Sequence, residues 1–126
     1  SGLLRVDGTV ARPVSAPRTG FGIDALATGP DGDAWVVASG GDVYRTDGGP
    51  LRLHAHIGEL ETARASAAMV DRDRRLWVAY GGTRAGLLPD GDGPFQPLSG
   101  ERIGTAQIYD FFEDREGHIW VAGAAG

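Results

Sequence analysis

The chain has 126 residues, of which 21 are glycine and 7 are proline, an excess that predicts a turn after nearly every element. Apolar residues make up 41%, so the chain can build a core, and its length suits one domain. The net charge of -5 argues against nucleic acid as a partner, no stretch approaches the ~20 apolar residues of a membrane span, and the lack of cysteine excludes disulfides and thiolate chemistry.

Short β-rich runs bounded by glycine, proline and aspartate predict strands along the whole chain. No window keeps a period of 3.6 residues, so no helix is expected. In chain order, the predicted strands are Gly2–Val6, Thr9–Val14, Ile23–Gly29, Ala34–Ala38, Val43–Thr46, Leu51–Ile57, Ser66–Val70, Leu76–Tyr80, Ala85–Leu88, Phe95–Leu98, Ile108–Glu113 and His118–Ala122.

Three of these strands carry the same motif. The segments DGDAWVV, DRRLWVA and EGHIWVA place Trp35, Trp77 and Trp120 at spacings of 42 and 43 residues. A period in the low forties with four short strands per repeat is typical of a β-propeller blade. A sugar-stacking role is the alternative, but the shared phase of the three tryptophans favours structural core positions between blades.

The repeat divides the chain into three blades of four strands. Two blades are continuous, at residues 23–64 and 65–107. The third is split between the ends of the chain, with residues 108–126 supplying its first two strands and residues 1–22 its last two. The sequence predicts an all-β propeller fragment in circularly permuted form.

The third repeat resembles the two-component regulator propeller repeat of bacterial sensor proteins. The resemblance rests on Glu113, Asp114, Gly117 and Trp120, and continues at the head of the chain through Gly2, Leu3, Leu4 and Arg5. The second repeat has Arg74 where the turn glycine is expected, and the first has Gly29 in place of the aspartate. This resemblance implies a periplasmic or other extracytoplasmic sensor region in the parent protein, with no catalytic residues and no cofactor.

Three blades are too few for a closed ring, because propellers commonly have 4–8 blades. Unpaired strand edges invite strand addition, so we expect the partner to be a second copy whose first strands complete the split blade. A dimer with six blades is favoured, and a trimer with nine is the alternative. The absent initiator methionine favours a processed or engineered soluble fragment, and an assembly piece without a ligand is a second hypothesis.

Binding is expected in the loops that join one blade to the next, where arginines suit an anionic, small-molecule or glycan ligand. The candidate ligand-binding residues in these loops are Arg18, Glu61, Arg64 and Arg102, and two further candidates, Tyr80 and Arg84, flank the turn between the second and third strands of the second blade.

No catalytic or metal site is expected. The acidic pairs Asp31/Asp33, Asp71/Asp73 and Asp114/Glu116 fit hairpin turns better than calcium loops, which need six to eight oxygen ligands. His54 and His56 lie two apart on one strand, so they face one side, as an exposed edge or as part of a zinc site across an oligomer axis. A carbohydrate-active lyase or hydrolase is the enzymatic alternative, and no facing pair of carboxylates points to it.

Overall fold

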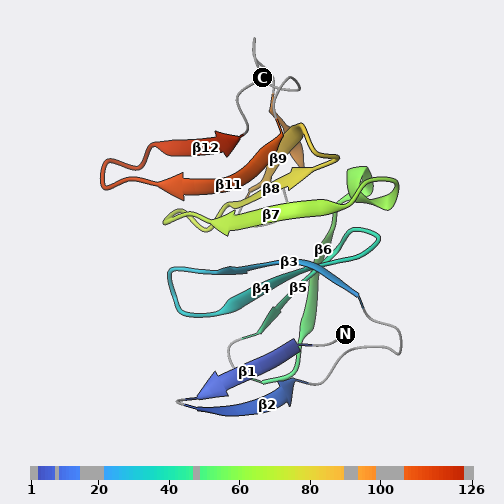
Figure 1. Cartoon of the computed structure of the whole chain (residues 1–126), viewed down its shortest axis with the longest axis vertical. Coiled ribbons are helices and arrows are strands. Elements are labelled where there is room, and N and C mark those ends of the chain that lie inside the picture. The colour runs from blue at the N-terminus through green and yellow to red at the C-terminus, as the bar shows by residue number, and fades with distance from the viewer. Residues whose placement is uncertain are drawn as a thin grey trace.

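The structure is a computed structural model, which describes residues 3–7, 9–14, 22–46, 49–89, 94–98 and 107–123. It contains twelve strands in these ranges and one short 3-10 helix (Figure 1). The elements are β1 (Leu3–Asp7), β2 (Val10–Val14), β3 (Ile23–Thr28), β4 (Ala34–Ala38), β5 (Asp42–Thr46), β6 (Arg52–His56), η1 (Gly58–Glu61), β7 (Ala65–Val70), β8 (Leu76–Tyr80), β9 (Arg84–Leu88), β10 (Gln96–Pro97), β11 (Ile108–Glu113) and β12 (Ile119–Gly123).

The strands form two complete antiparallel sheets and two hairpins. Strands β3–β6 form the first sheet and β7–β10 the second, each paired in chain order. Strands β1–β2 form the N-terminal hairpin and β11–β12 the C-terminal hairpin. Four-stranded antiparallel sheets that follow one another along the chain are the units predicted from the tryptophan period.

The sheets are stacked, with the two complete sheets between the two hairpins (Figure 1). The first strands β3, β7 and β11 lie next to one another, as β3 contacts β7 and β7 contacts β11. Side chains alternate between the two faces of a strand, so each sheet can pack on both neighbours at once. This repeated side-by-side packing of sheets through their first strands is the arrangement of propeller blades.

Two hydrophobic clusters fill the joints inside the stack. The larger lies between the first and second sheets and includes Trp35, Val37 and Val78. The other lies between the second sheet and the C-terminal hairpin and includes Trp77 and Phe111. The predicted tryptophan positions Trp35 and Trp77 are therefore buried at consecutive joints.

Each of β3, β7 and β11 has an irregularity at its second residue, where the pairing register shifts. The shifts fall between Ile23 and Ala25, between Ala65 and Ala67, and between Ile108 and Asp110. A bulge of this kind places one extra residue outside the regular pairing and turns the strand. Its recurrence shows that the three repeats agree in backbone detail as well as in sequence.

The second sheet differs from the prediction in its outer strand. The sequence predicts Phe95–Leu98, whereas β10 covers only two residues, Gln96 and Pro97. Phe95 instead packs edge-on against Tyr80, with ring centroids 5.8 Å apart. The structure also adds η1, whose residue Leu60 is buried, although no helix was expected. No helix within the described ranges is long and apolar enough to cross a membrane.

Candidate functional site

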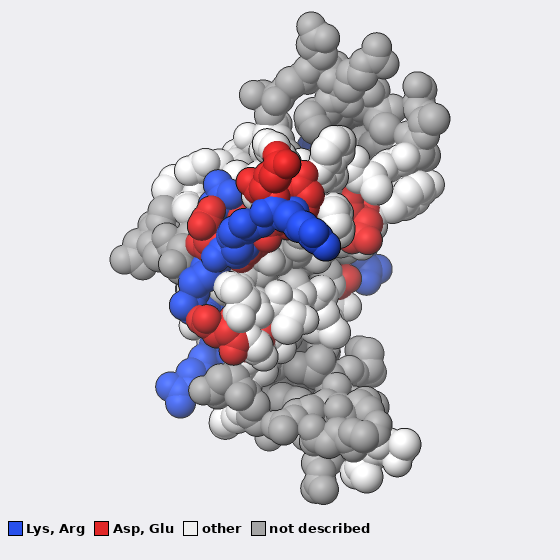
Figure 2. Space-filling view, turned by 90° about the vertical axis from the view of Figure 1, so that its left-hand side faces the viewer, with Lys and Arg blue, Asp and Glu red and all other residues white. Residues whose placement is uncertain are grey.

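The turns between the first and second strands form one end of the stack, which we call the turn face (residues 29–33, 71–75 and 114–118). Arginine and acidic side chains gather across the middle of this face (Figure 2). Arg74 Nη1 lies 2.7 Å from Asp31 Oδ2, and Arg72 Nε lies 3.2 Å from Glu113 Oε2. Both pairs cross from one sheet to the next, so the charges of the turn face hold neighbouring sheets together.

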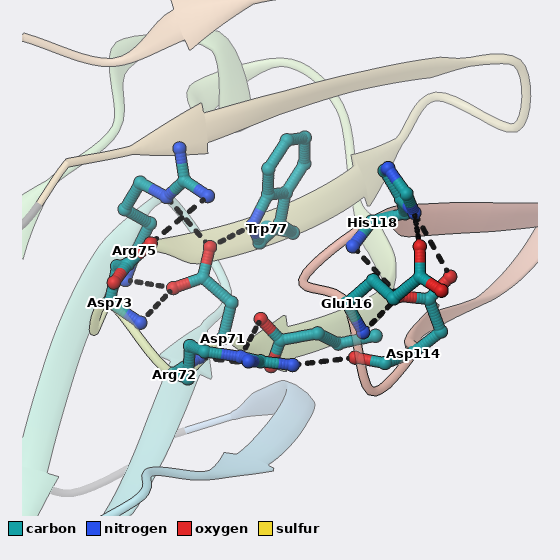
Figure 3. A network of polar contacts seen from close by, with 9 residues as sticks. Asp71, Arg72, Asp73, Arg75, Trp77, Asp114, Glu116 and His118 are labelled. Carbon is teal, nitrogen blue, oxygen red and sulfur yellow. Dashed lines mark hydrogen bonds and ion pairs between the residues drawn. The ribbon is translucent and has the colours of Figure 1, made fainter.

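Asp71 organises the turn of the second sheet (Figure 3). Its Oδ1 accepts hydrogen bonds from the backbone N–H groups of Asp73 and Arg75, both at 2.9 Å. Its Oδ2 accepts from Trp77 Nε1 at 2.8 Å and from Arg75 Nε at 2.7 Å. Burial raises the pKa of this carboxyl, but the hydrogen bonds from Trp77 and Arg75 outweigh burial and leave the pKa below its ordinary value. One carboxylate thus fixes both the turn and the tryptophan.

Asp114 repeats this arrangement in the C-terminal hairpin. Its Oδ1 accepts from the backbone of Glu116 and of His118 (Figure 3). Its Oδ2 accepts from Trp120 Nε1 at 2.9 Å. The hydrogen bond from Trp120 lowers the pKa of Asp114 to about 2. These acids are turn residues, as expected, and the sequence reading missed their second role as partners of the tryptophan six residues later.

The first sheet lacks this acid. Gly29 stands in its place, and the buried Nε1 of Trp35 has no hydrogen-bond partner. A Cβ at Gly29 would lie 3.0 Å from that nitrogen and 2.5 Å from Asp33 Oδ1. Asp33 instead pairs with Arg45, whose guanidinium lies 4.3 Å from the centroid of the Trp35 ring. Burial raises the pKa of Asp33, but the bond from Arg45 helps to bring it below its ordinary value.

The opposite end of the stack, which we call the loop face, contains residues 39–41, 57–64 and 81–83. The structure brings together three of the predicted binding residues here. Arg84 lies over the Tyr80 ring, 4.9 Å from its centroid. The carbonyl of Arg64 accepts a hydrogen bond from Gly81 at 3.1 Å, and the Arg64 guanidinium lies 3.3 Å from Asp24 Oδ1. Burial raises the pKa of Tyr80.

Of the other three predicted binding residues, only Glu61 is described, and it also lies on the loop face. Arg18 and Arg102 lie outside the described residues. Glu61 lies on η1 and bonds His56, whose Nε2 is 2.6 Å from Glu61 Oε2 and whose Nδ1 is 2.7 Å from Asp42 Oδ1. Both carboxylates, Glu61 first, raise the pKa of His56. This three-residue contact was not predicted, because no sequence spacing brings η1 back onto β6.

His54 and His56 have different surroundings, although both were expected on one side of a strand. The pairing of β5 and β6 shifts between Val43 and Tyr44, which lie opposite Ala55 and Leu53, so His54 falls at the shift. Its ring packs edge-on against Trp35 with centroids 4.9 Å apart. In the part of the chain that the structure describes, no group of three or more histidine and acidic side chains is arranged to hold a metal.

Trp120 departs from the prediction of a core position. Its side chain is 61% exposed, whereas Trp35 and Trp77 are 2% and 8% exposed. It occupies the same place in its hairpin as they do in their sheets, but no described sheet lies against the outer face of β11–β12. The exposed surface corresponds in position to the surfaces that Trp35 and Trp77 bury against the next sheet.

Comparison with known proteins agrees with this geometry. Residues 103–125 match the family model of the two-component regulator propeller, the family that the sequence resembles. No curated protein sequence matches the chain.

Three solved structures share the fold. A streptogramin B lyase structure superposes with a TM-score of 0.72 and 18% identity, over 95% of this chain and 40% of that one. A virginiamycin B lyase from Staphylococcus aureus gives 0.68 and 16%, over 93% and 40%. The structure of YCF48 bound to D1 peptide gives 0.66 and 21%, over 94% and 39%. The chain therefore spans about two fifths of the length of these structures, and the likeness shows a propeller-type fold.

Proposed function

We propose that this chain, which carries a two-component regulator propeller repeat at residues 103–125, is a non-enzymatic β-propeller module of a bacterial sensor-type protein. The proposed module closes into a ring with a second copy and binds ligand at the mouth of its channel. One observation carries the ring: within the described residues, β12 pairs only with β11 and β1 pairs only with β2.

The complete sheets indicate what these edges lack. In both of them the second strand pairs with a third, β4 with β5 and β8 with β9. Strand β12 corresponds to a second strand and β1 to a third. Free strand edges present unpaired N–H and C=O groups that another strand can satisfy. Pairing of β12 with β1 of a second copy would make every blade four-stranded, with six blades in the ring.

The mass in solution tests ring closure. We expect light scattering coupled to size exclusion to give twice the chain mass of 13.2 kDa, stable on dilution. Three times that mass would indicate the nine-bladed ring. A single 13.2 kDa species at all concentrations would overturn closure by a second copy.

The loop face is the proposed ligand surface. Arg64 and Arg84 are exposed there, on either side of the buried Tyr80. Guanidinium groups bind carboxylates, sulfates and phosphates in bidentate fashion and stack on flat rings. This chemistry favours an anionic or polyhydroxyl ligand such as an acidic glycan.

A thermal-shift screen of acidic and neutral glycans tests the surface. We expect an acidic glycan to raise the melting temperature of the wild type and to have less effect on the double variant R64Q/R84Q. Arg52→Gln is the matched control, because Arg52 is an exposed arginine on β6 outside the loop face. A screen without any stabilising compound would favour an assembly piece without a ligand of its own.

The absence of catalysis is also part of the proposal and needs its own assay. Two of the similar structures are lyases by name, one of streptogramin B and one of virginiamycin B, at identities of 18% and 16%. We expect no conversion when the protein is incubated with a streptogramin B and followed by liquid chromatography. Turnover above that of the heat-denatured protein would contradict a non-enzymatic module.

A further inference from the structure

The joint between the second sheet and the C-terminal hairpin follows a simple rule. Trp77 lies opposite Met69 across the β7–β8 pairing and faces the next sheet. There it packs on Phe111 of β11, with ring centroids 6.4 Å apart. Each joint therefore has two sides. We call the sheet that contributes a second-strand tryptophan the donor side of the joint. We call the following sheet, which contributes an apolar residue from the middle of its first strand, the acceptor side.

One end of the stack exposes an unused donor side. Trp120 lies opposite Phe112 across the β11–β12 pairing, as Trp77 lies opposite Met69. Phe112 is 63% exposed, and Trp120 is equally open. Two aromatic side chains adjacent on one face form an apolar surface of the kind that soluble proteins reserve for interfaces.

The first sheet exposes the matching acceptor position, on the face of β3 that is turned away from the second sheet. Leu26 lies opposite Val36 across β3–β4, just as Phe111 lies opposite Val121 across β11–β12. Its neighbours Ala25 and Ala27 pack into the joint with the second sheet, so Leu26 points the other way. It is 51% exposed, although Phe111 at the equivalent position is buried.

We propose that Trp120 and Phe112 of one copy pack against Leu26 of a second copy, forming a joint equivalent to the one between Trp77 and Phe111. This inference rests on the proposed ring closure and names the side chains that form it. One copy contributes its donor side to this joint and the other its acceptor side, and the two-fold axis of a dimer repeats the joint with the roles exchanged.

The polar contact at the joint between the second sheet and the C-terminal hairpin offers a way to strengthen the proposed joint. Arg72, which follows Asp71, donates through its backbone and side chain to Glu113 and through its guanidinium to the carbonyl of Asp114. Arg115 follows Asp114 in the same way and is exposed. The position equivalent to Glu113 in the first sheet is Thr28, so Arg115 would face Thr28 of the second copy. The substitution Thr28→Glu would supply the missing carboxylate.

Two variants test the joint, one at each end. Leu26→Asp damages the acceptor side and Trp120→Ala the donor side. Each alone should weaken self-association by at least about thirty-fold, because both joints of a closed dimer lose one partner. An equimolar mixture should associate more tightly than either variant alone, since one joint of the mixed dimer pairs an intact Trp120 with an intact Leu26, whereas both joints of each single-variant dimer lack a partner. Both side chains are largely exposed, so circular dichroism should show both variants folded.

Leu53→Asp is the matched control. Leu53 is a leucine of the same sheet and is 63% exposed, but it lies on the outer strand β6, away from the first strands that form the joints. Its substitution should leave the association constant within about three-fold of wild type, and Thr28→Glu should tighten association about three-fold to ten-fold.

The outcomes separate this inference from ring closure itself. A monomeric wild type would overturn both ring closure and this joint. A wild-type oligomer that survives both Leu26→Asp and Trp120→Ala keeps the ring and overturns this joint. Variants whose mixture associates no more tightly than either variant alone would overturn the pairing of Trp120 with Leu26 between copies.

Discussion

The two complete sheets hold the same tryptophan with different chemistry. In the second sheet, Asp71 binds the indole N–H of Trp77 and the turn backbone together. In the first sheet, Gly29 removes that acid, the Trp35 nitrogen is left without a partner, and Asp33 with Arg45 covers the ring instead. Both sheets therefore pack through the indole ring at this position, whereas the hydrogen bond from the indole N–H is a separate contribution that the first repeat lacks.

The largest expected effect comes from removing the acid where it is present. Asp71→Ala leaves the indole of Trp77, the Arg75 side chain and two turn N–H groups without their acceptor, so we expect a loss of about 3 kcal/mol in the free energy of unfolding. Urea denaturation followed by circular dichroism measures it. Asp73→Ala, on the exposed side of the same turn, should stay within about 0.5 kcal/mol of wild type. Equal losses in the two variants would contradict the role given to Asp71.

A double-mutant cycle tests whether the first sheet can adopt the chemistry of the second. Gly29→Asp alone should destabilise, because its Cβ would lie 2.5 Å from Asp33 Oδ1. Asp33→Ala alone should cost about 1–2 kcal/mol, because it removes the partner of Arg45. The double variant places a carboxylate near Trp35 Nε1 without the clash, so we expect a favourable coupling of at least about 1 kcal/mol. Simple additivity would show that the Trp35 site does not accept the acid.

The turns of the two sheets also differ in backbone strain. Arg74 has a φ of 65°, at the position where Gly32 has 84° and Gly117 has 86°. A side chain in this left-handed region costs about 1–2 kcal/mol, and the ion pair with Asp31 offsets part of that cost. We expect Arg74→Gly to stabilise by about 0.5–1 kcal/mol in urea. Arg72→Gly, outside the left-handed position, should destabilise, and stabilisation by both variants would contradict the strain argument.

The smallest effect concerns His56, whose two carboxylate partners have no counterpart among the described residues of the second sheet. The raised pKa means that the protonated form is stabilised on folding, so the contribution is complete below the unfolded pKa of about 6.5 and is lost as pH rises through the folded value. Because the site is exposed, the contribution is below about 1 kcal/mol. Unfolding at pH 6 and pH 8.5 should show a smaller pH dependence for His56→Gln than for wild type. His118→Gln is the control, and parallel profiles of wild type and His56→Gln would contradict the assignment.

Sequence reasoning reached the fold because the repeat is local and periodic. The spacing of Trp35, Trp77 and Trp120 sets the sheets, and the glycine and aspartate turns place strand ends within one or two residues of those found. The hydrogen bond between Asp71 and Trp77 could also have been predicted from the sequence, because Asp114 and Trp120 repeat the spacing of six residues. The interpretation of these acids as turn residues alone overlooked it.

The other contacts depend on packing between segments that the sequence pattern does not show. Glu61 contacts His56 because of the path that η1 takes after β6, and the local sequence pattern does not determine that path. The exposure of Trp120 depends on what covers its sheet, so an identical motif predicts a buried and an open tryptophan equally well. The arginines of the loop face were identified individually, but only the structure pairs Arg64 with Asp24.

The bulge at the start of each first strand allows the three repeats to differ at one position. It leaves one residue per repeat outside the regular alternation of side chains between the two faces of the sheet. Those residues are Asp24, Ser66 and Tyr109, three different chemistries at one geometry. Asp24 accepts hydrogen bonds from the backbone N–H of Ala65, at the start of the following repeat, and from the side chain of Arg64 just before it. The residue at the bulge can therefore differ between repeats without any change to the shared scaffold, and in the first repeat it adds a contact to the next sheet.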